Sequence, residues 1–190
     1  MLLRNRILKI IISLEFLVIS SMMPVTIPVP LFKNLNHIIE IPINWQIPIV
    51  IALTLLFSGE LLIKALSIYL FIGLFLFPVF FDGGSLGYLL TPNFGYLLGL
   101  FPLIKIINIL NKKKDLLFPE YLKYPIIGLT MMHLTGILYS CFLLLLFNKL
   151  NLIFFYIGKY SLSKVSFHIL IIFPTLIVVK FMKRFKVIIQ

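Results

Sequence analysis

The chain has 190 residues, of which 61% are hydrophobic and only 12% are charged, and its mean hydropathy is +1.13. A soluble domain carries about twice that charged fraction and cannot hide so much leucine, isoleucine and phenylalanine in its own core. The net charge of +11 would suit a nucleic-acid-binding protein, but basic residues also mark the cytoplasmic loops of membrane proteins. We therefore expect an integral membrane protein that contacts membrane lipid and binds no nucleic acid.

The N-terminal part of the chain predicts three helices and one long loop. Residues 8–23 form an apolar run that ends at Pro24 and lacks a small-x-small cleavage pattern, so we expect an uncleaved helix. Residues 24–45 contain four prolines, which favour an extended, stiff loop. Residues 47–77 would make one helix about 46 Å long, whereas the hydrocarbon core is about 30 Å thick. Ser58, Gly59 and Glu60 interrupt this run, which predicts two short helices joined by a tight turn.

The C-terminal part predicts three more helices. Pro78 ends the third helix, and a glycine-rich loop follows over residues 79–93. Further apolar runs predict helices at residues 95–111, 125–147 and 163–179, with a polar connection before the fifth helix and a second loop before the sixth. The chain has no internal repeat and no low-complexity linker. The expected fold is an all-α integral membrane protein, a bundle of six transmembrane helices in a single domain spanning residues 1–190.

The distribution of basic residues predicts the orientation of this bundle. If the N-terminus is cytoplasmic, the inner segments carry twelve Lys and Arg residues and the outer loops carry three, Lys33, Lys149 and Lys159. This excess on the inner side follows the positive-inside rule. We therefore predict a multi-pass protein of the plasma or inner membrane with both termini cytoplasmic. The twelve inner residues are Arg4, Arg6, Lys9, Lys64, Lys112, Lys113, Lys114, Lys123, Lys180, Lys183, Arg184 and Lys186.

The sequence contains no pattern that predicts catalysis. It has no phosphate-binding loop, no metal-ligand cluster and no Gly-x-Ser-x-Gly nucleophile turn. Asp82 and Asp115 fall on opposite sides of the membrane in the predicted topology, so they cannot act as a carboxylate pair. The single cysteine, Cys141, supports neither a disulfide nor a zinc site. We expect a protein that is not an enzyme and that needs no cofactor.

Polar and aromatic residues gather instead at the predicted outer end of the bundle. Taken singly, each has an ordinary structural explanation: Asn93 could cap a helix, and Trp45 and Tyr96 could belong to an interfacial aromatic belt. Together they lie beneath the two outer loops, which is the arrangement that a lidded binding pocket requires. The residues concerned are Asn44, Trp45, Gln46, Asp82, Asn93, Tyr96 and Lys164.

The central part of the chain resembles the BioY family. The segments that carry the resemblance are Tyr69-Leu-Phe-Ile-Gly73, Pro78-Val-Phe80, Asp82-Gly-Gly84 and Pro92-Asn-Phe-Gly-Tyr-Leu-Leu-Gly99. The proline-rich first loop and Asn44-Trp45-Gln46 match the family more loosely. BioY proteins are the biotin-specific S components of energy-coupling factor transporters. The resemblance implies capture of biotin from outside, under the two outer loops, and coupling to a transmembrane T component and two ATPase subunits.

The resemblance also implies which residues hold the ligand: Gln46, Asp82, Gly83, Asn93, Tyr96 and Lys164. Two features depart from the family pattern. The family often has Pro-Gly-Asp-x-x-Lys at the start of helix 6, and in one register Ser161 takes the place of the Asp while Lys164 is kept. In a second register, Val165 and His168 take those two places. The first helix also lacks the alanine stripe by which the family docks the T component, and its small residues are Ser13, Ser20 and Ser21.

The residues suit the chemistry of biotin. Gln46, Asn93 and Asp82 could pair with the ureido ring, and Lys164 could pair with the carboxylate. Aromatic side chains such as Trp45, Phe80 and Tyr96 could line the thiophane ring and the alkyl tail. Two alternatives remain open, an S component for another vitamin and a structural or assembly membrane protein that binds no small molecule.

Overall fold

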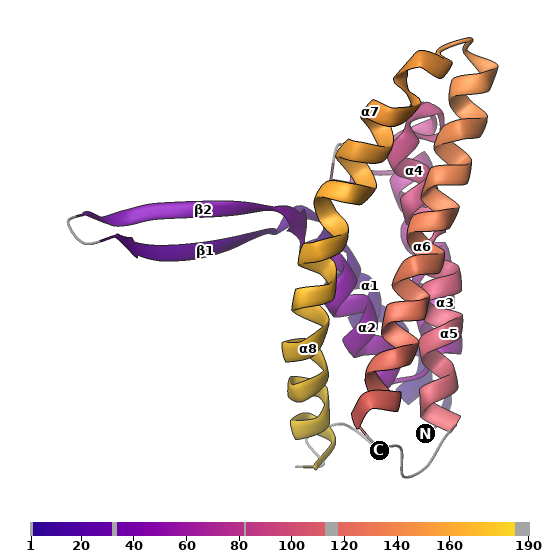
Figure 1. The fold of residues 1–190 in the computed structure, drawn as a ribbon. Helices are drawn as coiled ribbons and strands as arrows, with labels where there is room; N and C mark the ends of the chain where they lie inside the picture. Colours follow the sequence, from indigo (N-terminus) through magenta and orange to yellow (C-terminus); the bar gives the residue numbers. More distant parts are fainter. Residues whose placement is uncertain (1, 32–33, 82, 113–117, 185–190) are drawn as a thin grey trace.

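The computed structural model describes residues 2–31, 34–81, 83–112 and 118–184, and it is a helical bundle from which one β-hairpin projects sideways (Figure 1). Within these residues, six helical spans build the bundle, which confirms the expected all-α membrane fold. Two of these spans are composite, since α5 follows α4 after one residue and α8 continues from α7. The elements are α1 Leu2–Met22, β1 Pro24–Leu31, β2 Asn34–Asn44, α2 Gln46–Leu56, α3 Gly59–Phe75, η1 Leu86–Leu90, α4 Pro92–Leu98, α5 Leu100–Lys112, α6 Phe118–Leu146, η2 Leu150–Leu152, α7 Ile153–Ile157, η3 Gly158–Leu162 and α8 Ser163–Arg184.

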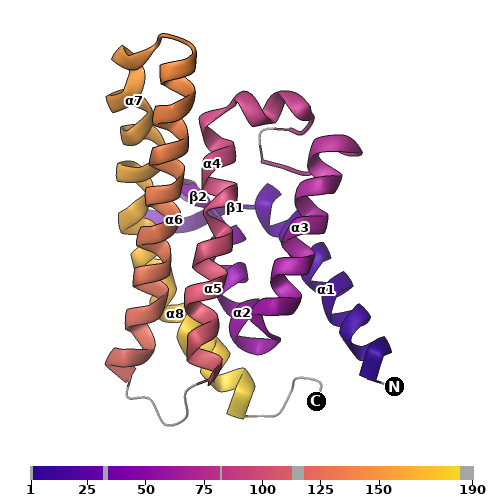
Figure 2. The ribbon, with the colours of Figure 1, turned by 90° about the vertical axis from the view of Figure 1, so that its right-hand side faces the viewer.

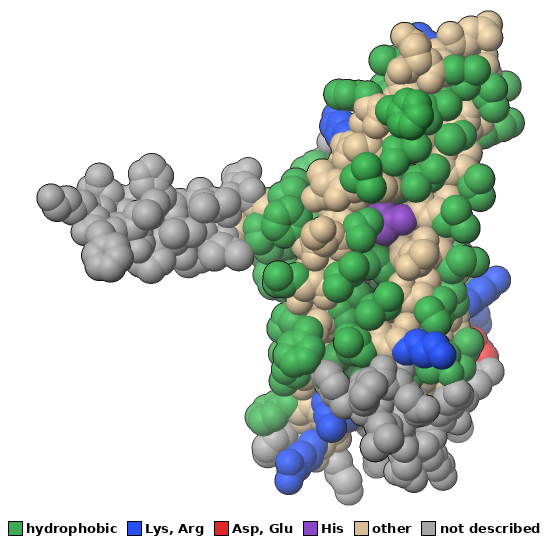
Figure 3. Space-filling model, viewed as in Figure 1, with side chains coloured by type: hydrophobic (Ala, Val, Ile, Leu, Met, Phe, Trp, Pro, Cys, Tyr) green, Lys and Arg blue, Asp and Glu red, His purple; other side chains and the backbone are tan. Residues whose placement is uncertain are grey.

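The surface of the bundle is built to contact lipid. Within the described residues, the segments Pro92–Leu110, Tyr121–Leu146 and Leu150–Arg184 are long and apolar enough to cross a membrane. Large apolar side chains such as Phe154 (86% exposed) and Leu170 (71% exposed) point outwards, which a soluble protein would not tolerate over so wide an area. Figure 3 shows this apolar face, with Lys and Arg side chains mostly towards the end at which α8 finishes.

The predicted break between the second and third helices is confirmed, and the structure gives its cause. Ser58 caps α3, because its Oγ accepts a hydrogen bond from the Leu61 N–H at 3.4 Å. The Gly59 N–H donates to the Oδ1 of Asn108 at 2.9 Å. A Cβ on Gly59 would lie 2.6 Å from the Cβ of Asn108, so only glycine allows α5 to approach this turn.

Residues 24–31 and 34–44 are extended, as the prolines of this segment predict, but they pair as antiparallel strands rather than forming a single-stranded loop. The register pairs Pro28 with Ile38 and is irregular beside Pro24 and Pro30. Proline lacks an N–H and is accommodated in strands that have a free edge, as both strands of a two-stranded sheet do. At the base of the hairpin, Val25 and Ile43 pack against Ile171 of α8. The hairpin is thus anchored where it leaves the bundle.

The loop expected before the sixth helix is largely helical. After Asn148, which has a positive φ of 53°, the chain forms η2 and α7 and then runs through a π-helical turn, Gly158–Leu162, directly into α8. No proline interrupts residues 148–162, and the segment is apolar enough to continue the helix. Asn93, for which a capping role was considered, lies one residue inside α4, and Thr91 occupies the N-cap position.

The beginning of α1 and the end of α8 lie at the same end of the bundle, as Figure 2 shows. We predict that this end is cytoplasmic, because it carries most of the basic residues. In a Cys141→Ser background, a membrane-impermeant maleimide should label Lys149→Cys in intact cells and should label Lys112→Cys only after permeabilisation. Labelling of position 112 in intact cells, with position 149 protected, would show that the topology is the reverse of the predicted one.

Candidate ligand-binding site

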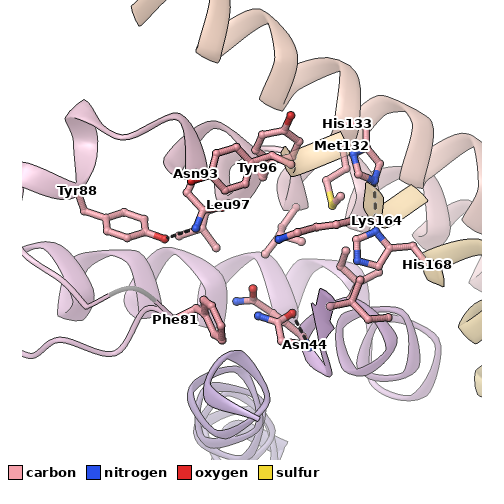
Figure 4. Close-up of a pocket in the computed structure, with 15 residues that line it drawn as sticks. Asn44, Phe81, Tyr88, Asn93, Tyr96, Leu97, Met132, His133, Lys164 and His168 are labelled. Atoms are coloured by element: carbon pink, nitrogen blue, oxygen red, sulfur yellow. Dashed lines mark hydrogen bonds between the residues drawn. The ribbon is translucent and has the colours of Figure 1, made fainter. Parts of the chain in front are cut away.

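A partly open cavity lies where α2, α4 and α8 begin, and it has an empty volume of about 610 Å³ (Figure 4). Its walls come from segments that are far apart in the sequence: the end of β2, α2, the loop after α3, η1, α4, α5, α6, η3 and α8. The lining residues are Ile43, Asn44, Gln46, Ile47, Phe81, Tyr88, Asn93, Tyr96, Leu97, Leu100, Met132, His133, Tyr160, Lys164 and His168.

Four of the six ligand-binding residues expected from the sequence, Gln46, Asn93, Tyr96 and Lys164, line this one cavity. Gly83 is not among the lining residues. It shapes the preceding turn, because its φ of +109° favours glycine and its backbone exchanges two hydrogen bonds with that of Phe80, at 2.8 and 3.0 Å. Asp82 lies outside the described residues.

Side-chain amides line one side of the cavity. Asn44 donates a hydrogen bond to the Ser21 carbonyl at 3.1 Å, which ties the end of β2 to α1. The Gln46 Nε2 donates to the Tyr69 hydroxyl at 3.3 Å, and the Asn93 Nδ2 donates to the Tyr88 hydroxyl at 3.1 Å. These bonds hold the amides in place before any ligand arrives, which reduces the entropy lost on binding.

An aromatic cluster supports the wall that contains Tyr88. The Phe80 ring lies 5.3 Å from the Tyr69 ring and 4.7 Å from the Tyr88 ring, and Phe80 is 1% exposed. Phe80 therefore lies behind the wall rather than in it, while Phe81 lines the cavity. A Cβ on Gly73 would lie 2.1 Å from the Phe80 ring, so glycine is required for this packing. Trp45, which was expected in the aromatic wall, is 38% exposed and is not among the lining residues.

The opposite wall is polar and belongs to α4, α6, η3 and α8. The Lys164 Nζ lies 5.5 Å from the centroid of the Tyr160 ring, and Figure 4 shows this side chain reaching into the middle of the cavity. Ser161 Oγ lies 2.7 Å from the Tyr96 hydroxyl and 3.2 Å from His133 Nδ1. His133 Nε2 in turn lies 3.3 Å from His168 Nδ1.

The two histidines are the site residues that the sequence did not predict. Each lies in an apolar helix, where a histidine commonly serves packing alone. Ser161 and His168 had been considered only as substitutes for the Asp and Lys of the family motif. The π-helical turn shifts the helix register, so that Ser161 is 3% exposed while the next residue, Leu162, is 71% exposed. Among the described residues, no group of three or more His, Cys, Asp or Glu side chains could hold a metal ion.

Comparisons with known proteins agree with this architecture. A search of curated proteins gives no match. One similar solved structure is described as the S-component for biotin from an ECF-type ABC transporter. It shares the fold with a TM-score of 0.70 and 16% sequence identity, and the match covers 94% of this chain and 90% of that one. Residues 4–184 match the BioY family. The chain therefore belongs to the BioY family, as the resemblance over residues 69–99 predicted, and is an integral protein of the cell membrane rather than an enzyme.

Proposed function

We propose that this protein is the substrate-binding S component of a biotin uptake system and that it holds biotin in the cavity described above. The observation that carries the proposal is the chemistry of the residues that line this one cavity, namely side-chain amides, aromatic rings and a lysine. Membership of the BioY family and the fold shared with a biotin S-component support the same ligand.

Each wall suits one part of biotin. Gln46 and Asn93 offer amide donors and acceptors to the ureido ring. Asp82, from the glycine-rich loop after α3, is the third residue that we propose to pair with this ring. Tyr88 and Tyr96 offer aromatic surface to the fused rings and the alkyl tail. The Lys164 ammonium would pair with the carboxylate, since charge-assisted hydrogen bonds are the strongest available to it.

We place access to the cavity at the base of the hairpin. A second, larger opening of about 1070 Å³ empty volume lies between the hairpin base, η3 and α8, and it shares Asn44, Phe81 and Lys164 with the binding cavity. A ligand arriving from the predicted outer side would meet these side chains first. In this proposal the first outer loop and the glycine-rich loop after α3 would close over the ligand, as the family resemblance implies.

The proposed partners are a transmembrane T component and two ATPase subunits, joined to a single domain formed by residues 1–190. In the family, small residues on the first helix dock the T component. Here Ser13, Ser20 and Ser21 are at most 3% exposed, and Ser21 donates a hydrogen bond to the Val79 carbonyl at 3.0 Å. These serines serve packing within the chain, so docking along α1 would use its exposed aliphatic face instead.

Thermal unfolding of the purified protein in detergent tests the proposed ligand. Biotin at about 100 times its dissociation constant should stabilise the folded state by about 2.7 kcal/mol, because it binds only the folded protein. Thiamine and riboflavin are the matched controls and should give no shift. Stabilisation by another vitamin in place of biotin would support an S component of different specificity. Stabilisation by none of them would favour the structural or assembly protein.

A further inference from the structure

The polar wall of the cavity contains a continuous chain of hydrogen-bonding groups that runs from α4 through η3 and α6 to α8. It begins at the Tyr96 hydroxyl, passes through Ser161 Oγ and both ring nitrogens of His133, and ends at His168. Ser161, His133 and His168 are 3%, 5% and 4% exposed, so the chain is almost entirely removed from solvent. Buried groups of this kind must satisfy one another, which restricts the positions of their protons.

The direction of the hydrogen bonds follows from the first group. We take Tyr96 as the donor to Ser161, because within the described part of the chain this is the one hydrogen bond that pairs its hydroxyl proton with a protein group. Ser161 then accepts from Tyr96 and donates its own proton to His133 Nδ1. Since His133 Nδ1 accepts, the proton of that ring is on Nε2, which donates to His168 Nδ1.

The same reasoning indicates which nitrogen of His168 carries the proton. His168 Nδ1 accepts, so the proton of His168 is on its second nitrogen, Nε2. Among the described residues, no hydrogen bond to this nitrogen is found. Every fully buried side-chain nitrogen in these residues has a partner, so His168 Nε2 must be at least partly accessible. His168 lines the cavity, and Figure 4 shows the second nitrogen on the cavity side of the ring, near Lys164. With this direction of the hydrogen bonds, the cavity wall presents an N–H donor beside the lysine ammonium.

We infer that His168 is a specificity residue that donates a hydrogen bond to the ligand's carboxylate, and that Tyr96, Ser161 and His133 are positioning residues that keep its ring in the donating tautomer. The inference rests on the proposed function and extends it, since it assigns a second donor to the anionic end of the ligand. A carboxylate has two oxygens, so Lys164 and His168 can each pair with one of them.

Equilibrium binding of biotin to four variants tests the assignment. His168→Phe keeps the ring shape without nitrogen and should weaken biotin binding roughly 10- to 150-fold, the range for a hydrogen bond to a charged group. His168→Gln retains an amide donor at a similar reach and should recover most of the affinity. Ser161→Ala, which breaks the chain without touching the cavity, should cause a smaller loss. Thr175→Val on α8 is the matched control, because Thr175 bonds only to the Ile171 carbonyl of its own helix and should bind biotin as the parent does.

The methyl ester of biotin identifies the ligand group that His168 meets. The loss caused by His168→Phe should be smaller for the ester, because its carbonyl is a neutral acceptor. An equal loss for the acid and the ester would place His168 against another part of the ligand and overturn the assignment. If the parent binds biotin and His168→Phe binds it equally well, the inference fails while the proposed function stands. A parent that does not bind biotin refutes the proposed function itself.

Nitrogen NMR of protein labelled with ¹⁵N-histidine tests the hydrogen-bond direction without any ligand. The chain has three histidines, and the His133→Gln and His168→Gln variants assign their signals. We expect His133 and His168 both to carry their protons on Nε2. Protons on Nδ1 of both rings would mean that the chain runs the other way and presents an acceptor to the cavity, which would overturn the inference.

Discussion

Replacing Lys164 by alanine is expected to weaken biotin binding by about 2–3 kcal/mol, roughly 30- to 150-fold in the dissociation constant. Lys164 reaches into the cavity from the first turn of α8, where its ammonium can form a charge-assisted hydrogen bond with the ligand's carboxylate. Removing the ammonium leaves the ligand's carboxylate partly desolvated without its cationic partner. Isothermal titration of the purified variant against biotin measures the loss.

Two controls separate this pairing from a general loss of structure. The methyl ester of biotin lacks the negative charge, so the parent and Lys164→Ala should bind it with similar affinity. Glu60→Ala, in the first turn of α3 and outside the residues that line the cavity, should bind biotin as tightly as the parent. If Lys164→Ala also binds biotin unchanged, the carboxylate lies elsewhere and the proposed orientation of the ligand is wrong.

Phe80→Ala should destabilise the folded protein by about 3 kcal/mol, the lower end of the range for deleting a phenylalanine from a packed interior. Phe80 fills the space between Tyr69 and Tyr88, at ring distances of 5.3 and 4.7 Å, and it is nearly inaccessible. Its removal leaves a void that the glycine at position 73 cannot fill. We expect the lower end of the range because lipid or detergent, unlike water, still solvates apolar groups exposed on unfolding.

The midpoint of thermal unfolding in detergent reports this change, and Phe77→Ala is the matched control. Phe77 lies three residues earlier and is 66% exposed, so its truncation should shift the midpoint little. Biotin binding to Phe80→Ala should weaken as well, because Phe80 supports Tyr88, which accepts the hydrogen bond of Asn93. Equal midpoints for the two variants would show that the aromatic cluster contributes no more than a lipid-facing ring.

Composition and local chemistry were sufficient to predict the helices and the C-terminal ends of most of them, whereas α1, α4 and α6 begin before the expected residues 8, 95 and 125. An apolar run must form its backbone hydrogen bonds within itself in lipid, so hydropathy alone indicates a helix. Pro24 and Pro78 end helices because proline cannot continue them, and Ser58 with Gly59 breaks a run too long for one span. The sequence predicts that four polar residues lie together, because each is at or near the start of a helix at the same end of the bundle. The structure places all four in one cavity: Gln46, Asn93, Tyr96 and Lys164.

Three features depended on contacts that no local pattern encodes. The strands β1 and β2 pair through residues with ordinary extended preferences, and strand pairing is decided by which segments meet. The π-helical turn that buries Ser161 adds no distinctive residue to the sequence. His133 and His168 are 35 residues apart on different helices, and only the packing of α6 beside α8 brings their rings within 3.3 Å. The sequence by itself determined the helices and the end at which polar groups gather, because those follow from hydropathy and charge. Only the tertiary structure decided which polar groups bond to one another, because that depends on helix rotation and on distances between helices.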